Sequence, residues 1–328
     1  MKYAVVAKSS DNPATRYRVA PIVDRLRARG DHVRVFYEPN LLSQVYLVLL
    51  ALRCNLIFVQ RKLLSTAVVW LLAKLNTPIV FDHDDAIFLK SSGLVSRTRQ
   101  ARYRAITRSS RLVLAGNSYL QRAAENEGIP SAVVPTSVEL ERYRTIEKEK
   151  CLTMVWIGSR STSRYLEEHR EVLSAIARRF PAIRLRVIGD FHFDVSGMQV
   201  ECFDWKESLE IQLLGSSHIG IAPMSDDIWT RGKCALKVIQ YMAAGLPVVS
   251  SNVGANRDVV SHGNTGFLVD TLDAWCEAID QLVGSDKLRA SMGAAGRSRV
   301  ELQYNQVEVS ARTIALLDEV VSRRISTN

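Results

Sequence analysis

The sequence predicts an α/β protein with two successive domains, each built on a parallel β-sheet. In the first half, short runs of Val, Ile and Leu alternate with amphipathic stretches, which is typical of buried parallel strands connected by helices. The charged segment Glu139–Lys150 has few apolar residues and reads as a linker, and the alternation starts again after it. The length of 328 residues suits two domains.

The first domain is expected over residues 1–145. Its strands are expected at Tyr3–Ala7, His32–Phe36, Leu56–Gln60, Ile79–Phe81, Leu112–Ala115 and Ala132–Val134. Its helices are expected at Arg18–Arg29, Leu41–Arg53, Leu63–Leu75, about 96–109 and from Ser118 onward. Gly30 marks the end of the first of these helices, because glycine adopts the conformation that terminates one.

The second domain is expected over residues 151–305. Its strands are expected at Met154–Ile157, Leu185–Ile188, Ile219–Ala222, Pro247–Ser250 and Phe267–Val269. Its helices are expected at Tyr165–Arg179, Lys233–Ala244 and along the rest of the chain to about Val321, of which 306–328 could pack back on the first domain. Ligands of such sheets bind at the carboxyl ends of the strands, so the expected site is a cleft between the domains.

Composition excludes several protein classes. The chain is 47% hydrophobic and 23% charged, which argues against disorder, and its five scattered cysteines without CxxC spacing argue against a disulfide scaffold and a zinc cage. We find neither a signal-peptide core at the N-terminus nor an uncharged apolar stretch long enough to cross a membrane. The expected location is cytosolic, or on the cytosolic face of a membrane.

The positive charge is concentrated in the first half. Residues 1–150 contain 24 Lys and Arg against 13 Asp and Glu (net +11), whereas residues 151–328 contain 19 against 21 (net −2). This asymmetry indicates an anionic partner or a solvated basic surface. Arg97, Arg104 and Arg108 share one helix face and, with the apolar Leu41–Leu52, suggest a surface that rests on anionic lipid; the alternative for Leu41–Leu52 is a buried helix. Nucleic acid is not expected, since no recognition module is present.

A strand, a loop and a helix follow one another between residues 219 and 268. Gly232 and Lys233 stand where that helix is expected to begin, and a helix N-terminus beside a glycine can bind a phosphate. Lys237 lies one turn further on the same face and could add charge, or it could be a solvated lysine.

Four segments resemble glycosyltransferases of family 4, which have the GT-B fold. They are Gln240–Val249 (QYMAAGLPVV), Gly263–Leu268 (GNTGFL), residues 133–144 (VVPTSVELERYR) and Asn117–Leu120 (NSYL). The resemblance implies two Rossmann-like domains facing across a cleft, the first binding the acceptor and the second binding the nucleotide-sugar. It also implies transfer with retention of configuration, without a metal or other cofactor.

The sequence departs from the family at its two paired glutamates, where it has Gly232 and Gln240. The second glutamate binds the ribose in the family, and Gln240 could still pair with a diol. The first glutamate usually faces the donor sugar in the family, and Gly232 has no side chain, so Asp226 and Asp227 are the candidates for recognising the sugar. Trp205 could pack beside the nucleobase or be a structural core residue.

The loop after the first strand of the second domain supplies basic residues to the donor diphosphate in the family. Here it contains Gly158, Ser159, Arg160 and Arg164, and a guanidinium group suits phosphate oxygens. With Lys233 and Lys237 these residues form the predicted diphosphate site. The alternative for the two arginines is an ordinary surface position.

Asp82, His83, Asp84 and Asp85 follow a strand of the first domain. Three interpretations compete: a metal site, which the family does not use; an acceptor site in which Asp84 or Asp85 orients the acceptor hydroxyl; and a helix cap. The second is preferred, so Asp84 and Asp85 are the predicted catalytic residues. Arg16 and Arg18 are candidate contacts for an acceptor phosphate, or ordinary charges at the start of a helix.

The sequence thus predicts a glycosyltransferase that moves a sugar from a nucleotide-sugar to a lipid-linked or glycan acceptor, in envelope polysaccharide synthesis. Two alternatives remain: a nucleotide-sugar epimerase of the same fold, and a non-catalytic relative that binds nucleotide or membrane.

Overall fold

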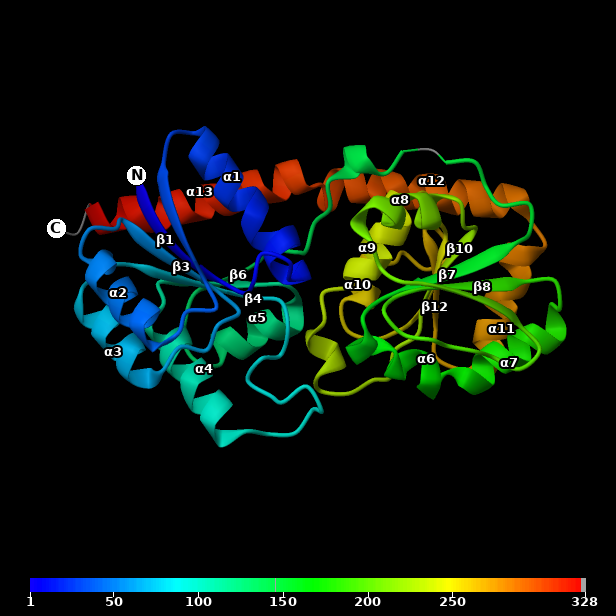
Figure 1. Cartoon of the computed structure of the whole chain (residues 1–328), viewed down its shortest axis with the longest axis horizontal. Coiled ribbons are helices and arrows are strands. Elements are labelled where there is room, and N and C mark those ends of the chain that lie inside the picture. Colours follow the sequence, from blue (N-terminus) through cyan, green and yellow to red (C-terminus); the bar gives the residue numbers. More distant parts are fainter. Residues whose placement is uncertain (145, 326–328) are drawn as a thin grey trace. The chain divides into compact units, whose positions relative to one another are not determined.

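The computed structural model describes residues 1–144 and 146–325, which separate into two compact units (Figure 1). Unit 1 contains Met1–Ser137, Asp227–Cys234 and the described residues from Gln306 on, and unit 2 contains Val138–Asp226 and Ala235–Asn305. The expected bounds placed 227–234 in the second domain, whereas the structure assigns this segment to unit 1. Residues 145 and 326–328, which those bounds include, lie outside the described residues.

Unit 1 is built on a parallel six-stranded sheet with the order β2-β1-β3-β4-β5-β6. Its strands are β1 (Lys2–Ala7), β2 (His32–Tyr37), β3 (Leu56–Gln60), β4 (Ile79–His83), β5 (Leu112–Ala115) and β6 (Ser131–Val133). Every residue of β3 and β4 is buried, as the continuous apolar runs predict for strands covered on both faces.

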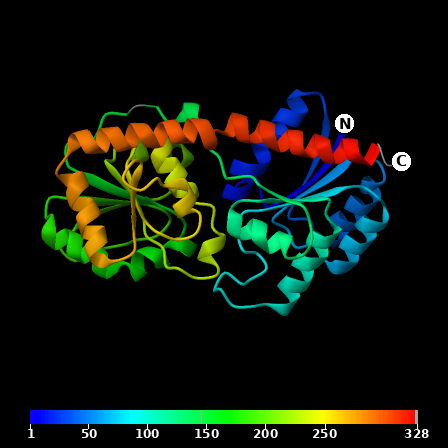
Figure 2. The ribbon, with the colours of Figure 1, turned by 180° about the vertical axis from the view of Figure 1, so that it is seen from behind.

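Helices cover both faces of this sheet (Figures 1 and 2). One face carries the π-helical turn η1 (Thr15–Val19), α1 (Ala20–Ala28) and α13 (Gln306–Ile325), whose apolar side chains pack together on β1 and β3. The other face carries α2 (Leu41–Ala51), α3 (Thr66–Lys74), α4 (Arg97–Ser109) and the end of α5 (Ser118–Glu125). The segment 227–234 adds the short turn η4 (Thr230–Gly232) to unit 1.

Unit 2 is built on a second parallel six-stranded sheet with the order β12-β11-β10-β7-β8-β9. Its strands are β7 (Thr153–Ile157), β8 (Arg184–Ile188), β9 (Gln199–Phe203), β10 (Ile219–Ala222), β11 (Val248–Ser251) and β12 (Gly266–Val269). Its helical elements are η2 (Leu140–Arg142), η3 (Arg160–Thr162), α6 (Arg164–Glu168), α7 (Arg170–Arg179), α8 (Glu207–Gly215), α9 (Leu236–Ala243), α10 (Asn256–Val259), α11 (Leu272–Val283) and α12 (Asp286–Gln303).

The predicted linker Glu139–Lys150 is not a free connection but part of unit 2. The side chain of Ile146 packs over Gly215, where a Cβ atom would approach it to 2.5 Å. Lys148 Nζ donates to the carbonyl oxygens of Gly215 and Ser217 at 2.9 and 2.8 Å. This burial lowers the pKa of Lys148 to about 8.

Two predicted helices are interrupted. The helix expected over Tyr165–Arg179 breaks at His169, whose Nδ1 lies 2.9 Å from the carbonyl oxygen of Tyr165 and so competes with the helical hydrogen bonds. The helix expected over Lys233–Ala244 begins only at Leu236, because Ala235 adopts a left-handed conformation with φ 53°. Lys233 therefore lies before the helix, and the prediction that it shares a helix face with Lys237 is wrong.

Candidate functional site

Three carboxylates gather at the carboxyl edge of the unit 1 sheet, where β4 ends. Asp82 is buried and pairs with Arg18, whose Nε and Nη2 both donate to its carboxylate while Nη1 donates to the carbonyl oxygen of Val134 at 2.8 Å. Arg18 is itself only 6% exposed. Its predicted contact with an acceptor phosphate is thus replaced by a buried ion pair, because all three guanidinium nitrogens are used inside the unit.

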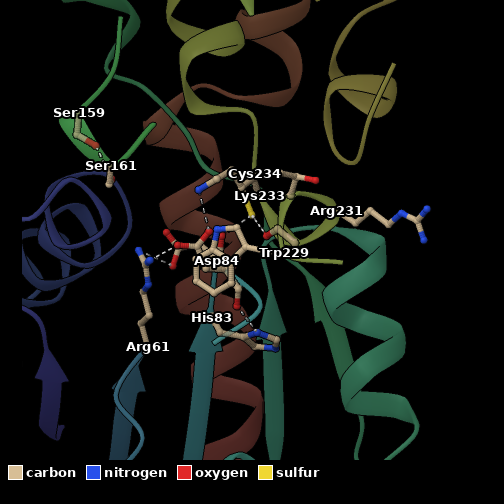
Figure 3. A network of polar contacts seen from close by, with 12 residues as sticks. Arg61, His83, Asp84, Ser159, Ser161, Trp229, Arg231, Lys233 and Cys234 are labelled. Carbon is tan, nitrogen blue, oxygen red and sulfur yellow. Dashed lines mark hydrogen bonds and ion pairs between the residues drawn. The ribbon is translucent and has the colours of Figure 1, made fainter. Parts of the chain in front are cut away.

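The other two carboxylates share cations, as Figure 3 shows. Arg61, directly after β3, donates to the Asp85 carboxylate and lies 3.7 Å from Asp84 Oδ1. Lys233 Nζ lies 3.6 Å from Asp85 Oδ1, and Gln60 Nε2 donates to Asp84 Oδ1 at 3.4 Å. The structure therefore brings together the predicted residues Asp84, Asp85 and Lys233, and adds Arg61.

Sequence reasoning missed Arg61. Asp84 was located by the rule that ligands bind at the carboxyl ends of parallel strands, and the same rule could have found Arg61. It follows strand β3, which is the direct neighbour of β4, so their carboxyl ends meet at one edge. The backbone of Arg61 is left-handed, with φ 55°. Such a conformation is unusual for a residue other than glycine and often accompanies a functional position.

His83 stands between the carboxylates but points into the core. It is fully buried, stacks on Phe81 and meets the edge of Tyr103, and its Nδ1 lies 3.4 Å from the carbonyl oxygen of Asp85. Burial lowers the pKa of His83 to about 4, so its imidazole is neutral at neutral pH.

The segment 227–234 is anchored to unit 1 by specific contacts. Asn117 Nδ2 donates to the carbonyl oxygens of Arg231 and Lys233 at 3.2 and 2.9 Å. Trp229 packs in a small apolar cluster with Ala86. Gly232 lies so close to this chain that a Cβ atom would come within 2.7 Å of the backbone nitrogen of Ala86. A glutamate at position 232 is therefore incompatible with this packing.

Cys234 belongs to the same network and contacts the backbone of Asp84 (Figure 3). Its thiol donates to the carbonyl oxygen of Asp84 at 3.1 Å. Burial raises the pKa of the Cys234 thiol well above its usual value, and the nearby Asp84 carboxylate raises it further. The thiol is consequently a structural donor in its neutral form and is poorly suited to act as a nucleophile.

Asp227 has a local role at the start of η4. Its Oδ1 accepts the backbone N–H groups of Trp229 and Thr230 at 2.7 and 2.8 Å, as in a turn cap. Asp226 is exposed. Arg16 stacks on the ring of Tyr17, 4.8 Å from its centroid. The predicted roles of Asp226 and Asp227 toward a sugar and of Arg16 toward an acceptor stay predictions.

In unit 2, the loop after β7 contains the residues Gly158, Ser159 and Arg160 of the predicted diphosphate site, and that role stays a prediction. Gly158 lies so close to Trp156 that a Cβ atom at this position would come within 2.5 Å of the indole ring. Ser159 and Arg160 are exposed, and Ser159 Oγ lies 2.8 Å from Ser161 Oγ. Arg164, at the start of α6, stacks on Tyr165 and donates to its hydroxyl at 2.9 Å.

Lys237 lies in the first turn of α9 over the same indole ring. Its Nζ is 4.0 Å from the ring centroid of Trp156, a cation–π contact. Since Gly158 also lies against Trp156, the lysine and the glycine loop are neighbours in unit 2. This gives Lys237 a defined position and rejects the alternative of a freely solvated helix lysine.

Gln240 and Trp205, the predicted nucleoside contacts, meet at a residue that sequence reasoning missed. Both donate to the carboxylate of buried Glu210, Gln240 Nε2 to Oε1 at 2.9 Å and Trp205 Nε1 to Oε2 at 2.7 Å. The Tyr143 hydroxyl also donates to Oε1, at 3.4 Å. Glu210 thus brings a carboxylate to Gln240, where the family has its own glutamate. No local sequence pattern distinguishes Glu210 from other helix glutamates.

Among the residues that the structure describes, no group of three or more His, Cys, Asp or Glu side chains is arranged to hold a metal ion. That the chemistry proceeds without a metal stays a prediction.

Residues 152–285 match the family model described as glycosyl transferases group 1. The chain is similar to that family over this segment, which is less than half of its length. The family segment contains the loop 158–164, Trp205, Glu210, Lys237 and Gln240, so the resemblance stated from the sequence is confirmed over this range.

Solved structures of the same fold cover nearly the whole chain. Sucrose-phosphate synthase from Thermosynechococcus elongatus matches with a TM-score of 0.80 at 16% identity, over 98% of this chain and 100% of that one. HepE from Anabaena, solved in complex with UDP-glucose, matches with a TM-score of 0.72 at 15% identity, over 97% and 100%. The predicted GT-B fold class is thereby confirmed.

Curated relatives match over shorter stretches. A capsular polysaccharide biosynthesis glycosyltransferase, CapM of Staphylococcus aureus, is 38% identical over 69 residues, which are 20% of this chain and 18% of CapM. A GDP-Man:Man(3)GlcNAc(2)-PP-Dol alpha-1,2-mannosyltransferase of Dictyostelium discoideum is 25% identical over 118 residues, which are 36% and 22%. The matches thus span about a fifth of these relatives. In the described part of this chain, no helix has the length and apolar character needed to cross a membrane.

Proposed function

We propose that this protein transfers a sugar from a nucleotide-sugar donor to a lipid-linked or glycan acceptor. One observation carries the proposal: the group 1 family segment contains both the basic glycine loop after β7 and the polar cluster around Glu210. The names of the relatives point the same way, since they describe a glycosyltransferase of capsular polysaccharide biosynthesis and an alpha-1,2-mannosyltransferase for a PP-Dol-linked glycan.

The donor would be held by unit 2. Arg160, Arg164 and Lys237 offer positive charge to its diphosphate, and Gly158 lets the phosphate approach the backbone. Gln240 would hydrogen-bond the ribose hydroxyls, and the buried Glu210 would hold Gln240 and Trp205 in position for the nucleoside. Stabilising the charge that develops on the departing diphosphate is the main catalytic contribution of these cations.

The acceptor would be oriented by unit 1. Asp85 is engaged by both Arg61 and Lys233, whereas Asp84 is half-buried and has longer contacts, at 3.4 Å to Gln60 and 3.7 Å to Arg61. Asp84 is therefore the better candidate to bind the attacking hydroxyl. Lys233 enters this proposal as a partner of Asp85 rather than as a diphosphate ligand.

The finer parts of the proposal follow from the family resemblance and the charge of unit 1. Transfer would retain the anomeric configuration, would need no metal and would serve envelope polysaccharide synthesis. The chain would work on the cytosolic side of a membrane whose anionic surface attracts unit 1. The anomer of the product, determined by NMR, tests the first of these statements.

A binding screen followed by a turnover assay tests the function. UDP, GDP, ADP, TDP and CMP are compared for their effect on the melting temperature, because a ligand that binds only the folded state raises it. The matching sugar nucleotide is then incubated with lipid extracts, and we expect release of the nucleoside diphosphate that depends on the acceptor. Conversion of the donor into another sugar nucleotide without acceptor would identify an epimerase instead. Binding without any turnover would identify a non-catalytic protein.

Arg164→Ala is expected to lower kcat by about 10²–10³, the range found when one donor to a developing anion is removed. Helix α6 has no second cation that could replace the charge of Arg164, so the loss should appear in kcat. The matched control is Arg178→Ala, an exposed arginine on α7. Equal turnover of the two variants would reject the diphosphate assignment.

A further inference from the structure

Helix α2 exposes an apolar face that none of the described residues of unit 1 covers. Leu47 and Ala51 are fully buried in the core, but on the opposite face Leu42 is 79% and Leu49 is 60% exposed. Val45 and Tyr46 lie on that same exposed face, because residues three and four apart are neighbours on a helix. The sequence left two alternatives for Leu41–Leu52, and the structure rejects the fully buried helix.

The neighbouring elements extend this face. Helix α3 packs beside α2, and α4 packs beside α3, in the layer seen on one side of the sheet in Figures 1 and 2. On α3, Trp70 is 60% exposed and Leu71 is also exposed. Leu94 and Val95, just before α4, are exposed as well. We call the exposed apolar side chains of α2 and α3 the apolar face; they are Leu41, Leu42, Val45, Tyr46, Leu49, Trp70 and Leu71.

The chain that forms this layer is strongly basic. Residues 39–124 contain 12 Lys and Arg, and their only acidic residues are Asp82, Asp84 and Asp85. These three carboxylates are paired with Arg18, Arg61 and Lys233, away from the helices. The exposed arginines of α4 are Arg97, Arg99, Arg102, Arg104 and Arg108, of which Arg104 and Arg108 pair with Glu127.

Two aromatic residues on the apolar face have a cation directly beside them. The Arg34 guanidinium lies 4.7 Å from the ring centroid of Tyr46 and donates to its hydroxyl. Lys74 Nζ lies 5.6 Å from the ring centroid of Trp70. Amphipathic aromatics with adjacent Lys or Arg are the side chains that favour the boundary between lipid tails and headgroups.

We propose that the apolar face docks on a lipid bilayer that contains anionic phospholipids. The leucines, Tyr46 and Trp70 enter the interface, while the arginines of α4 contact phosphate groups of the lipids. The occupant is argued from charge: exposed leucines in a layer that also carries Arg34, Lys74 and the exposed arginines of α4 complement an anionic membrane surface. This inference gives a location to the membrane contact in the proposed function, on which it builds.

Sedimentation with vesicles tests the proposal without any need for transferase activity. The full chain is mixed with phosphatidylcholine vesicles, with or without phosphatidylglycerol. We expect binding that requires phosphatidylglycerol, and a fall of about tenfold or more in affinity for Leu42→Glu/Leu49→Glu, since two anchoring side chains become charged. Leu302→Glu on α12 is the matched control, because Leu302 is equally exposed, at 77%, but lies in unit 2.

Trp70 provides a second readout at the surface itself. Its emission should shift to shorter wavelength when vesicles are added, and the shift should disappear in Trp70→Phe, while circular dichroism confirms that each variant is folded. Arg97→Ala/Arg102→Ala should weaken binding and reduce its dependence on salt.

Three outcomes would overturn the proposal. They are no binding of the wild type to either vesicle, equal binding of wild type and Leu42→Glu/Leu49→Glu, and a dimer in solution that this double variant dissociates while vesicles have no effect. The last result would assign the apolar face to a second copy of the chain. Vesicle binding by a chain without transferase activity would leave this inference intact and reject the proposed function alone.

Discussion

His83 stays neutral although it lies between acidic residues. Burial lowers its pKa more than the Asp84 carboxylate and the hydrogen bond to the Asp85 carbonyl raise it, and the resulting pKa is about 4. The neutral ring can then stack on Phe81 without the cost of a buried charge. The carboxylates are neutralised instead by Arg18, Arg61 and Lys233.

This arrangement predicts acid sensitivity that His83 itself causes. The pKa of His83 is lower in the folded chain than in the unfolded chain, so the unfolded chain binds the proton first and is favoured as pH falls from about 6.5 to about 4. Between pH 7 and 4.5 the free energy of unfolding of the wild type should fall by about 2–3 kcal/mol more than that of His83→Leu, because leucine does not titrate. Urea unfolding at both pH values measures this difference. Parallel losses in the two proteins would contradict a depressed pKa.

Gly232 occupies a position with no room for a side chain. A side chain there would meet the backbone of Ala86, so Gly232→Ala should destabilise the protein by about 1–3 kcal/mol through overpacking. Gly284→Ala is the control, because a Cβ atom at Gly284 has no neighbour closer than 3.4 Å. Thermal melting of both variants checks the prediction. If Gly232→Ala melts like the wild type, the close contact with Ala86 is not a constraint.

Among the elements, segment 227–234 depends most on a single side chain. Asn117 accepts the Leu120 N–H as the N-cap of α5 and donates to two carbonyl groups of the segment. Asn117→Asp keeps an acceptor for the cap but removes both donations and places a carboxylate beside the carbonyl oxygens. The variant therefore separates the role of Asn117 as the N-cap of α5 from its role in anchoring segment 227–234.

We expect Asn117→Asp to loosen the segment and increase the alkylation rate of Cys234. The thiol now donates to the Asp84 carbonyl inside the network, and opening of the segment exposes it. Peptide mass spectrometry after iodoacetamide treatment measures the rate at Cys234, and Cys276, buried in unit 2, serves as the internal control. An unchanged rate at Cys234 would show that Asn117 does not hold the segment.

Hydrophobic patterning predicted most of the strands and helices, and it failed where local contacts decide. The end of α6 depends on a hydrogen bond from His169 to the backbone, and the start of α9 depends on the left-handed Ala235. Strand β9 was missed because it is a half-buried edge strand without a continuous apolar run. The position of Asp84 followed from strand order, whereas Glu210 reaches Gln240 only through folding, which a pattern of spacings cannot show.

At the scale of the whole molecule, the C-terminal helix α13 belongs to unit 1, together with the N-terminal residues 1–137. Leu317 of α13 is fully buried with the side chains of α1 and the sheet, and the Arg29 guanidinium pairs with Asp318. The sequence left open whether this helix could pack back on the first domain, and the described residues of α13 do pack in unit 1.

Leu317→Ala is expected to destabilise unit 1 by about 2–5 kcal/mol, the range for deleting a buried leucine. Val307→Ala, at a position of the same helix that is 48% exposed, should change stability by less than about 1 kcal/mol. Calorimetry of both variants provides the comparison. Since unit 2 lacks α13, a transition that belongs to unit 2 should keep its midpoint, and a uniform shift of all transitions would mean that the two units unfold as one.

The three-piece make-up of unit 1 has a consequence for the order of events at the ribosome. Residues 1–137 are synthesised first, yet the apolar side chains of α1 and the sheet that pack against α13 have no such partner until Gln306–Ile325 has been synthesised, after every segment of unit 2. During this interval part of the apolar core of the N-terminal half is exposed, and we expect chaperones to bind the nascent chain at this stage.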